Sequence, residues 1–136
     1  MKPKYRRQHM PLCALGIYLI ASVFVSGCET MRGYDGPSRP RSAVARIVSS
    51  MHISAGEPIS IVIRRVDNTD VGVRFNSVDV LPGGHSLLID CTVTESKLTS
   101  RHHLDVDVEA GGKYRLVANT RLGNRECDNV ELIAVD

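Results

Sequence analysis

The sequence predicts an all-β fold, a small antiparallel β-sandwich, and three observations lead to this prediction. From residue 44 onward, apolar and polar residues alternate with a period of two, as in strands with one buried face. Turn-forming residues interrupt these runs at intervals of roughly 8–12 residues, a spacing typical of sandwiches and small barrels. The chain has no Trp and only two Phe, so its core must consist of Val, Ile and Leu, of which Val and Ile favour strands.

The alternation places the expected strands in order along the chain. Ile59, Ile61 and Ile63 share one face of the first clear strand. Further alternating runs cover residues 71–75, 87–93, 103–109 and 113–119. Residues 130–135 are apolar on both faces apart from Glu131, which predicts a central strand, and residues 46–51 are compatible with a single helical turn.

Turn chemistry separates these runs. Asp67-Asn68-Thr69-Asp70 lies between two expected strands, and Leu81-Pro82-Gly83-Gly84-His85 lies between two more. Ala110-Gly111-Gly112 predicts a tight hairpin between the strands on either side, because paired glycines supply the positive φ that such turns require.

Residues 1–27 predict a cleaved export signal. Lys2, Lys4, Arg6 and Arg7 form a basic start, and residues 12–25 are almost wholly apolar. This apolar run has the length of a signal-peptide core and is shorter than the roughly 20 residues of a membrane-spanning helix, which is the alternative. Without the four basic residues, the remaining chain has 13 Lys and Arg against 15 Asp and Glu, so its charge gives no support to nucleic-acid binding.

Val25-Ser26-Gly27-Cys28 resembles the lipobox of bacterial lipoproteins, with Val where Leu is preferred. The resemblance implies cleavage before Cys28 and lipidation of its thiol, so that the chain meets the membrane through lipid on Cys28. Two or three acyl chains are needed for stable anchoring, because one chain holds only marginally. The resemblance also implies that Glu29, where Asp would retain the protein at the inner membrane, directs it to the periplasmic face of the outer membrane.

Residues 28–43 predict a flexible tether, and residues 44–136 predict the β-sandwich domain. The segment 29–42 holds two Gly, two Pro and two Ser and has no apolar periodicity, which is typical of a solvated linker. Its three arginines offer contacts to acidic headgroups as an alternative. In a second alternative, Tyr34-Asp35-Gly36-Pro37 docks onto the domain and Tyr34 becomes partly buried.

The four cysteines have different expected fates. Cys13 lies in the segment expected to be removed and Cys28 is expected to carry lipid, which leaves Cys91 and Cys127. An even pair in an exported domain predicts a disulfide, and two free thiols are the alternative. The bridge would close a loop of about 37 residues, worth about 4 kcal/mol in the chain-entropy model.

The turns and strands together resemble those of small bacterial lipoproteins and of PEGA-type β domains. The resemblance rests on Asp67 after an Ile/Val strand, on Leu81-Pro82-Gly83-Gly84-His85 before a strand, and on Glu109-Ala110-Gly111-Gly112-Lys113-Tyr114. The sequence departs from PEGA domains at Val66-Asp67-Asn68, where those domains have a Val-Asp-Gly turn. The resemblance implies an extracytoplasmic β-sandwich that serves as a structural or interaction module.

Candidate chemical groups have structural interpretations that we favour. His103, Asp105, Asp107 and Glu109 share one face of a strand, next to His102, and suggest a weak cation site. Such residues lie about 7 Å apart along a strand and do not converge, so a polar outer face is the simpler interpretation.

No catalytic residue, metal or other cofactor is predicted. Ser86 adjoins His85 but points to the opposite face of an extended strand, so we expect His85 to support the turn rather than to act as a base. Asp79 and Asp90 would form an acid–base pair only if the fold brought them together.

The sequence therefore predicts a non-enzymatic, membrane-anchored interaction module of the cell envelope. We expect its partner to be another envelope protein, met through sheet edges or loops. The first alternative is a ligand-binding or inhibitor lipoprotein, similar to those that block lysozymes, with the polar segment 94–103 as its inserted loop. An enzyme is the second alternative.

Overall fold

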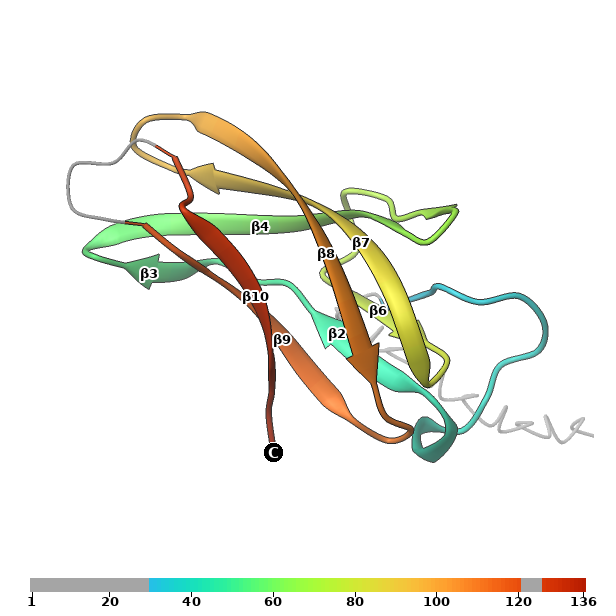
Figure 1. Ribbon diagram of the computed structural model, residues 1–136. Helices are drawn as coiled ribbons and strands as arrows, with labels where there is room; N and C mark the ends of the chain where they lie inside the picture. Colours follow the sequence, from blue (N-terminus) through green and yellow to red (C-terminus); the bar gives the residue numbers. More distant parts are fainter. Residues whose placement is uncertain (1–29, 121–125) are drawn as a thin grey trace, which may run out of the picture.

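A computed structural model describes residues 30–120 and 126–136, and in this part of the chain the fold is all-β. Two sheets pack face to face around one apolar core, as the sequence predicted (Figure 1). The predictions for the signal peptide, for Cys28 and for Glu29 fall on residues outside the described ranges.

Sheet A contains both antiparallel and parallel pairs. Its strand order is β1 (Thr30–Arg32), β6 (Ser77–Val80), β2 (Ala45–Val48), β9 (Lys113–Asn119) and β10 (Asn129–Ala134). The pairs β1–β6 and β2–β9 are parallel, while β2–β6 and β9–β10 are antiparallel. Parallel neighbours come from segments far apart in the chain, so the local alternation of residues gave no sign of them.

Sheet B is antiparallel throughout. Its order is β3 (His52–Ser54), β4 (Glu57–Val66), β7 (Gly83–Val93) and β8 (Leu98–Val108), and the short β5 (Thr69–Asp70) pairs with the end of β4. A register shift between Ile63 and Arg65 reverses the alternation, so that Val66 is buried and Arg65 is exposed.

The core confirms the predicted apolar faces of four strands. Ile59, Ile61 and Ile63 of β4 are buried, and they face residues of sheet A such as Ile47 and Leu116 in the same cluster. The other three predicted strands also bury the expected face. The buried residues are Leu87, Ile89, Cys91 and Val93 in β7, Leu116 and Ala118 in β9, and Val108 in β8, where Leu104 and Val106 are half-buried.

The predicted disulfide between Cys91 and Cys127 is present. Cys91 lies on the buried face of β7 in sheet B, and Cys127 lies just before β10 in sheet A. The bridge therefore joins the two sheets covalently.

Three predicted elements are wrong. Residues 71–75 form a loop in which Val71 is buried but Val73 is 68% exposed, and the strand lies further on, as β6. The amide of Phe75 donates to the carbonyl of Gly72, so this run turns instead of extending. Residues 46–51 contain β2 and no helical turn, because β6 and β9 hydrogen-bond to it from both sides. The last strand, β10, lies at the edge of sheet A and not at its centre, with Ile133 40% exposed.

The predicted hairpin at Ala110-Gly111-Gly112 is instead a crossing between sheets. The strand before it, β8, belongs to sheet B, and the strand after it, β9, belongs to sheet A. Gly111 has the expected positive φ of 77°, and its amide donates to the carbonyl of Val44. The glycines thus bind the crossing to the start of β2, since the amide of Arg46 also donates to the carbonyl of Gly112.

The segment predicted as a flexible tether is ordered from Thr30 onward. Thr30–Arg32 forms β1 along β6, and Arg41–Ala43 forms a 3-10 turn, η1. A Cβ on Gly33 would lie 2.9 Å from the side chain of Val78, so glycine is what allows this close approach. Tyr34 is half-buried, as the alternative of a docked segment required, and its hydroxyl accepts a hydrogen bond from the amide of Arg39.

Candidate interaction surface

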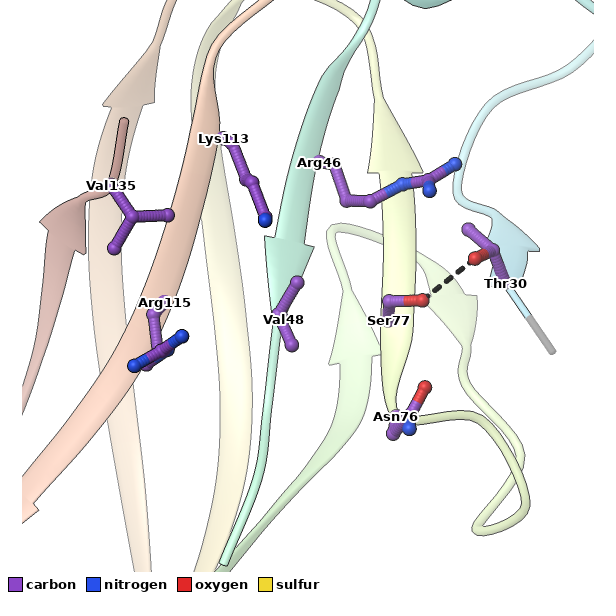
Figure 2. Close-up of a pocket in the computed structure, with 8 residues that line it drawn as sticks. All are labelled: Thr30, Arg46, Val48, Asn76, Ser77, Lys113, Arg115 and Val135. Carbon is purple, nitrogen blue, oxygen red and sulfur yellow. Dashed lines mark hydrogen bonds between the residues drawn. The ribbon is translucent and has the colours of Figure 1, made fainter. Parts of the chain in front are cut away.

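The outer face of sheet A carries a groove with a basic rim. Its volume is about 270 Å³, and its lining comes from β1, β6, β2 and β9 and from the residues next to β6 and β10 (Figure 2). The lining residues are Thr30, Arg46, Val48, Asn76, Ser77, Lys113, Arg115 and Val135. We refer to these eight residues as the basic groove.

The strand alternation places these side chains on one face. In β2, Ala45 and Ile47 point into the core, so Arg46 points outward. In β9, Leu116 and Ala118 are buried, so Lys113 and Arg115 point outward. The parallel register then sets Arg46 directly opposite Lys113.

Hydroxyl groups form the opposite wall of the groove. The Oγ1 of Thr30 lies 2.8 Å from the Oγ of Ser77, and this hydrogen bond ties β1 to β6 (Figure 2). Ser77 is only 5% exposed, so its hydroxyl is largely withdrawn from water. Because one of these two hydroxyls donates to the other, one hydroxyl hydrogen and the amide of Asn76 remain to donate to an anion.

The groove has an excess of positive charge. Arg46 binds Asp79 with both ends of its guanidinium, at 2.7 and 2.8 Å, and these hydrogen bonds raise the pKa of Arg46. Lys113 and Arg115 are exposed, and among the described residues no carboxylate lies within ion-pair distance of either. Arg46 lies opposite Lys113 in the register, but its charge is balanced by Asp79, so the excess positive charge of the groove belongs to Lys113 and Arg115.

The predicted support of the turn by His85 is confirmed. Its Nε2 lies 2.7 Å from the carbonyl oxygen of Leu81, which can only accept, so Nε2–H donates. Its Nδ1 lies 2.7 Å from Oδ2 of Asp67, and Oδ1 of the same carboxylate accepts from the amide of Ser86 at 2.9 Å. The hydrogen bond from His85, helped by that from Ser86, lowers the pKa of Asp67. The two residues thus join the β4–β5 turn to the start of β7.

Asp79 and Asp90 do not come together. Asp79 belongs to β6 of sheet A, and Asp90 belongs to β7 of sheet B. Asp90 accepts two hydrogen bonds from Arg101, at 2.7 and 3.1 Å, and lies 3.5 Å from Arg64. The hydrogen bonding of Arg101 is the main cause that lowers the pKa of Asp90, and the charges of both arginines add to it. The hypothetical acid–base pair is therefore two separate ion-pair sites on different sheets.

The acidic strand face lies where the alternation predicted. His103, Asp105 and Asp107 are exposed on β8, while His102 points to the other face and hydrogen-bonds Ser100 at 2.9 Å. Within residues 30–120 and 126–136, no group of three or more His, Cys, Asp or Glu side chains is arranged to hold a metal ion.

The polar segment 94–103 is not the long loop that the inhibitor alternative used. Residues 94–97 make a tight turn, in which the amide of Lys97 donates to the carbonyl of Val93, and β8 begins at Leu98. The remaining residues, 98–103, pair with residues 88–93 of β7.

Comparison of the chain with models of protein families, with curated proteins and with solved structures finds no match. The resemblance to bacterial lipoproteins and to PEGA-type domains therefore stays a prediction from short motifs. Along the described residues, no helix has the length and hydrophobicity needed to cross a membrane.

Sequence reasoning missed the basic groove. In the sequence, Lys113 and Arg115 mark the polar side of an alternating strand, but Arg46 falls in the expected helical turn and Thr30 in the expected tether. The available signal was the alternation of Ala45, Arg46, Ile47 and Val48, which marks a strand with an outward arginine. The parallel pairing of that strand with β9 had no local signal.

Proposed function

We propose that this chain is a lipid-anchored, non-enzymatic interaction module of the bacterial cell envelope, held at the periplasmic face of the outer membrane through Cys28. The observation that carries the proposal is the sequence Val25-Ser26-Gly27-Cys28 after a basic start and an apolar run. A folded domain follows directly, since β1 begins at Thr30.

Two structural features support this proposal. The Cys91–Cys127 bridge suits a compartment outside the reducing cytoplasm. Two candidates for acid–base chemistry have structural partners: His85 is held by Asp67 and Leu81, and Asp90 is held by two arginines.

Free sheet edges are the places where a partner protein would meet this domain. Among the residues that the structure describes, β8 pairs with β7 alone, and between β8 and β10 lies a groove of about 440 Å³. Its lining combines apolar side chains with two carboxylates and consists of Leu104, Asp105, Val106, Asp107, Tyr114, Leu132 and Ala134. Exposed edges and grooves with apolar walls are common sites of protein association.

The proposal is tested by replacing the lipidation site. Wild type and Cys28→Ser are expressed in a Gram-negative host with labelled palmitate, and the mature masses and the membrane fractions are compared. Wild type should carry label, begin at residue 28 and sediment with outer membranes. Cys28→Ser should lose the label and retain residues 1–27. If Cys28→Ser is labelled and processed like wild type, the proposed anchor is wrong, and Cys13→Ser serves as the matched control that should change nothing.

A further inference from the structure

We propose that the basic groove docks on the membrane itself and takes the phosphate of an anionic phospholipid headgroup. This inference rests on the proposed lipidation of Cys28. It goes further by assigning a ligand class to the groove and an orientation to the domain.

The first argument is the short length of chain between Cys28 and the groove. Two residue steps separate Cys28 from Thr30, and they span at most about 7 Å. Thr30 itself is fixed in β1, in register with Ser77, and its hydroxyl lines the groove. Lipid on Cys28 would hold that residue at the headgroup layer, so the groove would stand within reach of headgroups.

The second argument is charge. The domain as a whole has slightly more acidic than basic residues, yet the face next to the anchor carries Lys113 and Arg115 without carboxylate partners among the described residues. Near an anionic membrane surface, each such side chain strengthens attachment about fivefold. A phosphate in the groove would supply the negative partner that these two side chains lack.

The third argument is the fit between the groove and a phosphate group. Arg and Lys provide charged donors, and the hydroxyl that accepts in the hydrogen bond between Thr30 and Ser77 provides a neutral one. A volume of about 270 Å³ is suited to a headgroup rather than to a larger ligand. A soluble phosphate has the same chemistry, but the anchor keeps membrane phosphates at a high effective concentration beside the groove.

The experiment uses the two lysines that follow Cys28. Lys113 lies in the groove, and Lys97 lies exposed in the β7–β8 turn, so the chain carries its own control. The 11 residues of β8 separate that turn from the crossing to β9, and Figure 1 shows the two positions at opposite ends of the molecule.

Mature lipidated protein is reconstituted into vesicles of phosphatidylcholine alone or with added phosphatidylglycerol. A water-soluble amine acylating reagent is applied, and mass spectrometry gives the acylation rate of each lysine. We expect the Lys113 to Lys97 rate ratio to fall at least about fivefold when phosphatidylglycerol is present. High salt should restore the ratio, because it screens exposed charges.

Two charge-reversal variants sharpen the result. Arg115→Glu, in the groove, should abolish most of the protection of Lys113. Arg65→Glu makes the same charge change on sheet B, where its exposed ion pair with Asp70 contributes little, and should leave the protection intact. The comparison of wild type between the two kinds of vesicle does not depend on the folding of either variant.

An unchanged Lys113 to Lys97 ratio in the two kinds of vesicle would overturn the inference. Equal protection by inorganic phosphate in phosphatidylcholine vesicles would also overturn it, because the ligand would then be a soluble anion. Failure of the proposed function has a different signature, since a protein without lipid would lack the mass of the acyl chains and would not float with vesicles.

Discussion

Removal of the Cys91–Cys127 bridge should destabilise the domain by about 4 kcal/mol. The two cysteines are 36 residues apart in sequence and join different sheets. Closing a loop of this length in the unfolded chain removes about 13 cal/mol/K of entropy in the chain-entropy model, which is about 4 kcal/mol at 25 °C. Domains of this size are stable by only about 5–15 kcal/mol, so the loss is a large fraction of the total.

The perturbation is the double variant Cys91→Ala/Cys127→Ala in a mature chain that begins at Glu29, measured beside wild type with and without reductant. Urea unfolding is followed by far-UV circular dichroism. With a slope of about 1–2 kcal/mol/M, the urea midpoint should fall by about 2–4 M. Reduction of wild type should produce a similar fall, because it opens the loop but leaves both buried sulfur atoms in place.

The comparison separates the loop from the packing. Cys91 and Cys127 are both buried, so their replacement by Ala also removes packed atoms and should cost somewhat more than reduction does. Reductant should not change the double variant, which serves as the control for nonspecific effects. If reduced wild type unfolds within about 1 kcal/mol of oxidised wild type, the bridge does not restrict the unfolded chain as argued.

Two further predictions concern turns. The lowered pKa of Asp67 means that its interaction with His85 stabilises the fold above the unfolded-state pKa of about 3.9 and is lost as pH falls through the lower folded-state value. Asp67→Asn should therefore be less stable than wild type at pH 6, and Asn tolerates the φ of 51° at this position. The difference in free energy of unfolding between the two proteins, measured by urea unfolding, should narrow below about pH 4. A difference that does not change with pH would contradict this prediction. Gly112→Ala places a Cβ 2.6 Å from the ring of Tyr114 and should lower the free energy of unfolding by about 1–3 kcal/mol. Gly84→Ala is the control, because the nearest atom to its Cβ is 4.0 Å away, so its urea midpoint should hardly change.

The predictable part of the fold was the part encoded by local alternation. Ile59, Ile61 and Ile63 had to face one way, and a face of three Ile residues has to be buried. The same alternation places Cys91 on the buried face of its strand, where a disulfide to the other sheet is possible. The strand expected over residues 71–75 is wrong because a short apolar run fits a turn as well as a strand. Val71 is buried, but it lies in a loop that turns at Gly72 and Phe75.

Connections between strands were predicted less well than the strands themselves. Ala110-Gly111-Gly112 has the chemistry of a hairpin, and Gly111 does adopt positive φ. A hairpin and a crossing between sheets need similar backbone freedom, so turn residues alone do not distinguish them. The deciding interactions are long-range, namely the hydrogen bonds from Gly111 to Val44 and from Arg46 to Gly112.

These long-range interactions also create the basic groove. Because the chain crosses to sheet A after β8, β9 lies parallel to β2, and only this pairing brings Lys113 opposite Arg46. Because Thr30 joins β6, the same face begins two residues after Cys28. A free tether of 16 residues would have let the domain turn any face to the membrane. With β1 in the sheet, anchoring at Cys28 would hold the basic groove beside the headgroups, so the proposed anchor and the chemistry of the surface lead to the same functional proposal.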